Sequence, residues 1–232
     1  MEDELFMDLA STCPIDEKTL HNAYRTRFPS PILPDAHEMP KQEKITRIAE
    51  KFRDIMEILG LDLTDESLQR TPYRVAKMYV EEVFSGLDPE NFPQITLFND
   101  DFQHGVRSNL VFVKTNFHSF CEHHFVPMEG TAYIAYIPNG KLIGLSKIPR
   151  IVRHFSRRPQ VQERLTAQIA DALSILIGTD HVAVSLCAQH HCMTARGVES
   201  ENSHAITHVL RGDFDTDPSL RKQFFDAQKL NR

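Results

Sequence analysis

Two stretches, SNLVFVKTNFHSF (residues 108–120) and GTAYIAYIPNGKLIGLS (residues 130–146), decide the fold. Both are rich in β-branched and aromatic residues, a composition typical of strands. The Pro138-Asn139-Gly140 tripeptide in the second stretch predicts a turn between two strands. The chain therefore changes to strand-forming sequence after Pro93.

Helical patterns follow these strands. The segments SKIPRIVRHFSRR (residues 146–158) and PQVQERLTAQIADALSILIG (residues 159–178) both space their apolar residues as helices do. DHVAVSLCAQHHC (residues 180–192) alternates like a strand, and NSHAITHVLRGDF (residues 202–214) is a further expected strand before a short C-terminal helix. Strands that come in pairs favour antiparallel pairing, so the predicted class is α+β.

The part of the chain before these strands is expected to be mostly helical. RFPSPILPDAHEMP (residues 27–40) has four prolines in 14 positions, so residues 1–41 are predicted to be a partly irregular leader with one short helix over residues 16–27. A longer helix is expected from Gln42 to a stop at Gly60. Another is expected from Thr71, as N-cap before Pro72, to Gly86. The predicted division is 1–41, a helical region over 42–98, and a catalytic domain over 99–232.

Composition limits the class of protein. The 232 residues are 41% hydrophobic and 25% charged, which is ordinary for a globular protein. A net charge of -6 argues against a general nucleic-acid binder. No apolar run approaches the roughly 18 residues of a membrane span. The acidic start MEDELFMDLA lacks the basic region of a secretory signal, so we expect a cytoplasmic protein without membrane or nucleic-acid partners.

Cysteine and histidine gather in two short motifs, CEHHF (residues 121–125) and QHHC (residues 189–192). In a reducing cytosol such clusters indicate a metal more often than a disulfide. Cys121, His124 and Cys192 form a set of three ligands, and zinc with three protein ligands keeps a fourth position open for catalysis. Two alternatives stay open: Cys187 as a fourth ligand would close the site, and His190 could bind in place of His124.

The histidines left over have two interpretations. His123 and His190 beside a catalytic metal are suited to move protons near neutral pH, or they simply support the ligands or lie on the surface. Other zinc patterns are missing, namely H-E-x-x-H, the nucleobase-deaminase signature and paired C-x-x-C knuckles. Those classes of zinc protein are therefore excluded.

Basic residues near these motifs predict a site for an anion. Ser146 is a natural N-cap, and Lys147 and Arg150 follow it by one helical turn, an arrangement that suits a phosphate. Arg196 follows Cys192, and Arg74 follows the Thr-Pro helix start. We expect Lys147, Arg150 and Arg196 to bind a phosphorylated small molecule. The helix face of Arg153, Arg157 and Arg158 is expected to be solvated.

Glu163 lies in the first turn of the apolar helix after residue 159. A carboxylate there stabilises the helix dipole, and it can equally accept two hydrogen bonds from the N1–H and 2-amino edge of guanine. The residues alone leave both interpretations open.

The motifs CEHHFVP, GLSKIPRIV, RRPQVQERLT and HHCMTARG, in this order and spacing, resemble the GTP cyclohydrolase I family from about Gln42 to the C-terminus. The resemblance implies hydrolysis of GTP to 7,8-dihydroneopterin triphosphate and formate, at the entry to tetrahydrofolate or tetrahydrobiopterin synthesis. It implies one zinc ion per subunit on Cys121, His124 and Cys192, and acid–base roles for His123 and His190.

The resemblance also implies how GTP is held. Glu163 matches the residue that anchors the guanine edge, helped by Gln162 or its backbone, and Ser146 matches a serine near the ribose. Lys147, Arg150 and Arg196 match the triphosphate grip, and Arg74 matches an arginine that reaches a neighbouring subunit's site.

The implied architecture is the tunnelling fold, a four-stranded antiparallel sheet with two helices, preceded by N-terminal helices. Five sheets close into a barrel and two such rings stack into a decamer, with sites at subunit interfaces. His204, His208 and Cys187 depart from the family pattern. Rival interpretations are an enzyme that stops after ring opening, a zinc scaffold without turnover, and a metal-storage protein that uses these three extra residues.

Overall fold

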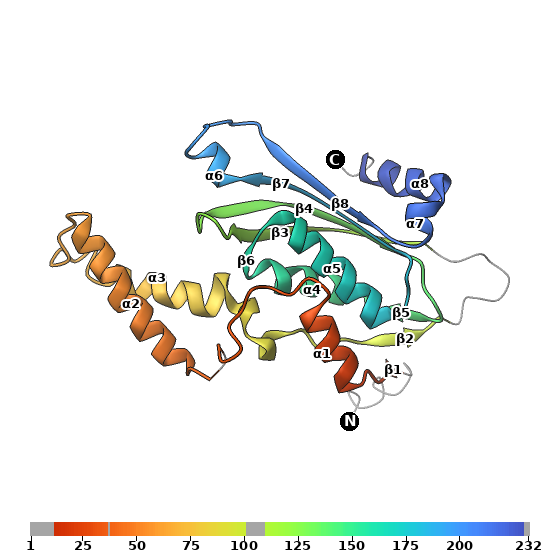
Figure 1. Cartoon of the computed structure of the whole chain (residues 1–232), viewed down its shortest axis with the longest axis horizontal. Helices are drawn as coiled ribbons and strands as arrows, with labels where there is room; N and C mark the ends of the chain where they lie inside the picture. The colour runs from red at the N-terminus through yellow and green to blue at the C-terminus, as the bar shows by residue number, and fades with distance from the viewer. Residues whose placement is uncertain (1–11, 37, 101–109, 230–232) are drawn as a thin grey trace, which may run out of the picture.

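The computed structural model describes residues 12–36, 38–100 and 110–229. Its main sheet has five strands in the order β6-β3-β4-β7-β8 (Figure 1). Four strands form antiparallel ladders: β3 (Val111–Cys121), β4 (Pro127–Tyr136), β7 (Val182–His190) and β8 (His204–Leu210). The fifth, β6 (Pro159–Gln160), pairs parallel with the end of β3. The α+β class and the strands after residue 110 agree with the prediction from the sequence.

The strand order brings two distant segments together. β3 and β7 both pair antiparallel with β4, which lies between them, so they run in the same direction. Ser119 of β3 and His190 of β7 both lie opposite Met128. The last residues of β3 and β7 therefore lie at one end of the sheet, roughly 10 Å apart by the usual strand spacing.

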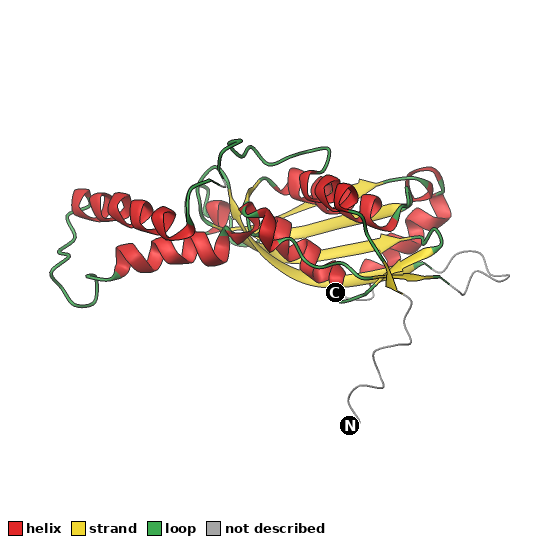
Figure 2. Ribbon diagram, turned by 90° about the horizontal axis from the view of Figure 1, so that it is seen from below, coloured by secondary structure: helices red, strands yellow, loops and turns green. Residues whose placement is uncertain are grey.

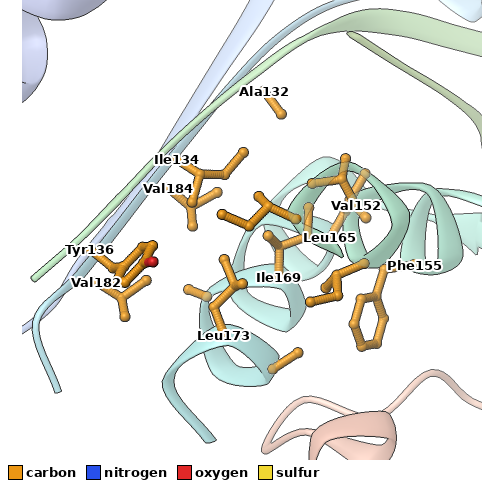
Figure 3. Packing of buried hydrophobic residues seen from close by; sticks show 14 of the residues in the cluster. Ala132, Ile134, Tyr136, Val152, Phe155, Leu165, Ile169, Leu173, Val182 and Val184 are labelled. Carbon is orange, nitrogen blue, oxygen red and sulfur yellow. The ribbon is translucent and has the colours of Figure 1, made fainter. Parts of the chain in front are cut away.

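Helices α4 (Lys147–Ser156) and α5 (Gln162–Ile177) pack on one face of this sheet (Figure 1). Alternate residues of a strand point to one face, and Ile134 and Val184, which are partners in register, both point toward α5. Figure 3 shows them facing Leu165, Ile169 and Leu173, all fully buried. This apolar layer holds the start of α5 against the strand ends.

The other face is partly covered by the C-terminal helices α7 (Asp213–Thr216) and α8 (Pro218–Lys229). Phe214 and Phe224 pack there on Tyr133 and Ala135, whose side chains point away from α5. The sequence predicted one helix in this region, and α7 is an additional short one.

The expected turn at residues 138–140 joins strands of different sheets. β4 precedes the turn in the main sheet, whereas β5 (Lys141–Ile143) follows it in a three-stranded sheet of order β1-β2-β5, with β1 (Thr12–Cys13) and β2 (Leu97–Asn99). The predicted turn between two strands is therefore confirmed, although the two strands do not pair with each other. Both sides of β4 are already paired, with β3 and β7, so β5 takes β2 as its partner instead.

The N-terminal helices are α1 (Glu17–Arg25), α2 (Lys41–Ile58) and α3 (Thr71–Met78). Figures 1 and 2 show α2 and α3 as a hairpin that projects beyond the sheet. Residues 1–11 and 37 of the expected leader lie outside the described residues. The predicted boundary between residues 98 and 99 falls inside β2, and the division into three parts stays a prediction. Within the described ranges, no helix is long and apolar enough to span a bilayer.

The third helix differs from its prediction at both ends. Arg70, one residue before Thr71, is the N-cap. After Met78 the chain continues as a π-helix, η1 (Tyr79–Val83), and two 3₁₀ turns, η2 (Ser85–Leu87) and η3 (Pro89–Asn91). At Gly86 a β-carbon would lie 2.0 Å from the carbonyl oxygen of His154, so only glycine allows this backbone to pack on α4.

Arg158 is not on the solvated face that the sequence suggested. It is 1% exposed, and its guanidinium donates to the Gly86 carbonyl at 2.8 Å and to His154 Nε2 at 2.7 Å. The guanidinium also lies over the rings of Tyr24 (4.9 Å) and Phe155 (4.7 Å). The prediction failed because α4 ends at Ser156 and the chain turns inward to form β6.

Candidate metal centre and its surroundings

Two thiols and one imidazole meet where β3 and β7 end. The ligand atoms of Cys121, His124 and Cys192 all lie within 4.8 Å of one another. Cys121 is the last residue of β3, His124 follows in the β3–β4 turn, and Cys192 belongs to the short helix α6 (His191–Thr194). Over the described part of the chain this is the one group of three or more possible ligands, and it includes neither Cys187 nor His190. A closed four-ligand site and a second metal-storage site both lack support.

A tight turn presents the first two ligands. The Cys121 amide donates to the Val126 carbonyl at 2.9 Å, and the Phe125 amide donates back to the Cys121 carbonyl at 2.8 Å. Phe125 has a φ of 53°, an uncommon left-handed conformation for a bulky residue. Its ring packs on Phe84 at 5.3 Å, which holds the strained turn in place.

The donor set suits a divalent cation with a preference for sulfur. Burial raises the pKa of the Cys192 thiol, and the neighbouring Cys121 raises that pKa further, with Arg196 opposing both effects. Without a cation, two thiolates so close together are unfavourable, and a bound metal removes that penalty. Two sulfurs and one nitrogen are ligands typical of zinc. The three residues therefore fit the expected metal.

His190 is held by Gln162 at the edge of the metal centre. Its Nε2 lies 2.8 Å from Gln162 Oε1, while Gln162 Nε2 donates to the Leu186 carbonyl (3.1 Å) and the Ala205 carbonyl (3.0 Å). Since both amide hydrogens are used, Oε1 must accept from His190, so the neutral ring carries its hydrogen on Nε2. Nδ1 is then the nitrogen left for another partner.

Gln162 does not offer its side chain to a ligand. It is 2% exposed, and its amide is fully engaged with His190 and the strands. Glu163, the next residue, is exposed. Burial lowers the pKa of His190 and the charge of the Glu163 carboxylate raises it, so the two side chains lie within electrostatic reach of each other.

His123 and Arg196 also lie beside the metal ligands. His123 Nδ1 is 3.9 Å from Cys121 Sγ, and the His123 side chain is exposed. Arg196 is exposed and close enough to Cys192 to lower the pKa of its thiol. One end of the sheet thus brings His123, His190, Glu163 and Arg196 close to the three candidate metal ligands.

Ser146 and Lys147 follow β5, which lies near the other end of β4 within one chain. β4 starts beside the metal ligands and ends at Tyr136, a span of about 30 Å for ten residues. The Tyr136 hydroxyl accepts from the Ile143 amide at 3.4 Å, so β5, which leads into α4, lies at the far end. Ser146 occupies the N-cap of α4 as predicted, but its side chain makes no capping hydrogen bond.

Arg74 lies on the projecting helix α3 and is exposed. Within residues 12–36, 38–100 and 110–229, no carboxylate pairs with the charged groups of Arg74, Lys147, Arg150 or Arg196. Cavities of about 460 Å³ near His181 and about 540 Å³ near Tyr24 are lined by none of the metal ligands. Of the three candidate ligands, Cys121 is buried, Cys192 is partly exposed and His124 is exposed.

Sequence reasoning missed one pair at the centre. The Arg164 guanidinium donates to both carboxylate oxygens of Glu122, at 2.6 and 3.2 Å. Each residue lies inside a motif that the sequence singled out, but nothing in either motif identifies its partner.

Comparisons with known proteins agree on one family. The sequence model described as GTP cyclohydrolase I matches residues 48–229. The protein "GTP cyclohydrolase 1" of Aeromonas salmonicida (strain A449) is 50% identical over 194 residues, which cover 84% of this chain and 88% of the relative. "GTP cyclohydrolase 1" of Escherichia coli O1:K1 / APEC is 46% identical over 209 residues, which cover 90% and 93%.

Among solved structures, the archaeosine synthase QueF-Like in the apo form is 16% identical with a TM-score of 0.39, covering 46% of this chain and 97% of that chain. A likeness this weak adds nothing to the description of the fold.

Proposed function

The chain belongs to the GTP cyclohydrolase I family, and on this basis we propose that it hydrolyses GTP to 7,8-dihydroneopterin triphosphate and formate at the metal centre. The observation that supports this most is the meeting of Cys121, His124 and Cys192 beside His190 and Glu163. A metal, an acid–base group and a guanine-binding carboxylate are the parts that opening of the guanine imidazole ring requires.

Cys121, His124 and Cys192 would hold one zinc ion per subunit. A metal held there would supply Lewis-acid chemistry suited to activating water for hydrolysis of the ring. Every other contribution to the reaction comes from side chains of the protein.

His190 is the proposed acid for the guanine ring. Because Gln162 binds Nε2, the ring exchanges protons with the substrate through Nδ1. Only the imidazolium form of His190 carries a proton on Nδ1 while Nε2 donates to Gln162, so that form would pass the Nδ1 proton to N7 and become the neutral ring; protonation of N7 makes C8 more electrophilic and promotes ring opening. His123 and Ser146 are proposed to serve the later proton transfers, in which the ribose carbons rearrange and close into the pterin.

Glu163 and the backbone of Gln162 are proposed to bind the guanine edge. The exposed carboxylate of Glu163 accepts hydrogen bonds from N1–H and the 2-amino group, and its place at the first turn of α5 directs the base toward His190. Selectivity for guanine follows, since adenine offers no such pair of donors.

Lys147, Arg150 and Ser146 are proposed to come from a neighbouring subunit. β5, which leads into Ser146 and Lys147, lies near the end of β4 opposite the metal ligands, and β4 is about 30 Å long, which supports this. Arg196, together with Lys147 and Arg150 from the neighbouring subunit, would bind the triphosphate. Arg74 would reach the site of a further subunit. We propose the tunnelling fold, with sheets that close into a barrel in a toroidal decamer, as the assembly. A cytoplasmic location, with neither membrane nor nucleic acid as a partner, completes the proposal.

The test uses the full chain, GTP and two assays. Formate is measured in the reaction, and the product is oxidised and examined for pterin fluorescence. Equal amounts of formate and pterin support the proposal. Formate without pterin would indicate an enzyme that stops after ring opening, and neither product would leave a zinc scaffold without turnover.

A further inference from the structure

The Glu122–Arg164 ion pair has the geometry of a specific structural contact. Two parallel hydrogen bonds of 2.6 and 3.2 Å join the guanidinium to the carboxylate. Each side chain is 22% exposed, so water only partly screens the pair. Bidentate arginine–carboxylate pairs restrict orientation as well as distance, because the guanidinium is planar and rigid.

The two residues come from opposite parts of the site. Glu122 lies between the ligands Cys121 and His124, and Arg164 follows Glu163 in the first turn of α5. The ion pair therefore joins the turn that carries two metal ligands to the helix that carries the guanine-binding carboxylate. The backbone adds one bond in the same direction, from the Glu122 amide to the Gln160 carbonyl at 3.0 Å.

Gln162, two positions before Arg164 in α5, contacts the end of the other strand that leads to a candidate ligand. Gln162 holds His190 at the end of β7, two residues before the ligand Cys192. Gln162 and Arg164, on either side of Glu163, thus contact the end of β7 and the β3–β4 turn. These two contacts restrict where the start of α5, and with it Glu163, lies relative to the candidate ligands.

We propose that Glu122 and Arg164 are positioning residues that fix the metal-binding turn relative to Glu163, and thereby fix the metal relative to C8 of the bound guanine. The inference rests on the proposed function for the identity of the substrate. Neither residue touches a reacting atom. Misplacement of a metal or substrate by about 1 Å can cost on the order of 100-fold in rate, so a contact that fixes their relative position affects turnover.

A double-mutant cycle tests the proposal. Glu122→Gln and Arg164→Gln each remove the charge while keeping a polar side chain, and the double variant removes both. We expect each single variant to lower kcat by about tenfold or more with little change in KM, and the double variant to be no worse than the singles. Arg164→Lys should also fail, because lysine keeps the charge and lacks the planar fork.

A second readout is independent of turnover. Zinc loss to a coloured chelator is followed in the absence of GTP, and each single variant should release zinc about tenfold faster, again without additivity in the double variant. The matched control is the exposed Glu43–Arg47 pair of α2, whose N–O distance is 3.6 Å. Glu43→Gln and Arg47→Gln should change neither kcat nor zinc release.

Three results would overturn the proposal: losses of kcat that multiply in the double variant, full recovery by Arg164→Lys, or a lower melting temperature with unchanged kcat and zinc release. The last result would mean that the pair only stabilises the fold. If the wild-type chain released no formate from GTP while the effects of the two variants on zinc release were still non-additive, the positioning role of Glu122 and Arg164 would be supported and the proposed substrate would be wrong.

Discussion

His154 should make the protein less stable in mild acid. It is 5% exposed, its Nδ1 is 3.1 Å from the Asn91 carbonyl oxygen, and its Nε2 accepts from Arg158. Burial and then the neighbouring Arg158 charge lower the pKa of His154 from 6.5 to about 3. Between these two pH values the unfolded chain binds a proton that the folded chain does not.

The direction and size of the effect follow from this difference in proton binding. Stability is unaffected above pH 6.5 and falls as the pH drops toward the folded pKa of about 3. Between pH 7.5 and pH 5.0, His154 alone should remove about 2 kcal/mol from the free energy of unfolding, at 1.36 kcal/mol per pKa unit.

The assay compares wild type with His154→Gln in urea titrations at both pH values and one protein concentration. Glutamine keeps an acceptor for Arg158 but cannot gain a proton in this range. We expect the variant to be less stable at pH 7.5, yet to lose about 2 kcal/mol less than wild type on moving to pH 5.0. An equal loss in both proteins would refute the reasoning, because it would show that His154 titrates normally in the folded chain.

Three further predictions concern the fold and the site. Gly86→Ala should destabilise the protein by about 2 kcal/mol or more in urea titrations, because its β-carbon would meet backbone atoms, and stability equal to wild type would contradict the packing. Gln162→Leu should lower kcat more than it changes KM. It should also lower the free energy of unfolding by roughly 2 kcal/mol, because two buried carbonyls lose their hydrogen-bond donor. An unchanged kcat would contradict the role given to Gln162. Cys192→Ser and Lys147→Ala should each abolish formate release. If each site takes Cys192 from one subunit and Lys147 from its neighbour, the two variants denatured and refolded together in equal amounts should recover roughly a quarter of wild-type activity. No recovery in a correctly assembled mixture would mean that one chain supplies both.

The metal centre was predictable because its residue types are scarce and informative. Cysteine and histidine concentrate in CEHHF and QHHC, and three of them supply the ligand set. The reason that the two motifs meet is topological, since β3 and β7 flank β4 and end at the same end of the sheet. Paired strands implied antiparallel ladders, but the sequence did not indicate which strand would lie in the middle.

Other features depend on partners that a local pattern cannot identify. Arg158 looks like a surface residue because it follows a basic helix face, and its burial depends on Gly86 and Tyr24, both distant in sequence. The 138–140 turn has the expected residues, yet whether β5 pairs with β4 depends on which strands already occupy both sides of β4. The Glu122–Arg164 pair is hidden for the same reason, because side-chain partners 42 positions apart are chosen by the fold.

The extra histidines show a limit of another kind. His204 and His208 invited an interpretation as a second metal site, but β8 presents both as exposed side chains of a strand, and the described residues form no second group of ligands around them. Residue type alone overstates metal binding when the donors do not converge.

The most direct test of the account is a zinc titration of turnover. Metal is removed from the full chain with a chelator, zinc is returned in steps from zero to two equivalents, and formate release from GTP is measured at each step. We expect the rate to rise in proportion to zinc and to stop rising at one zinc ion per chain, as one group of three ligands requires. Full-rate formate release from the stripped protein, or none with one zinc ion bound per chain, would contradict it.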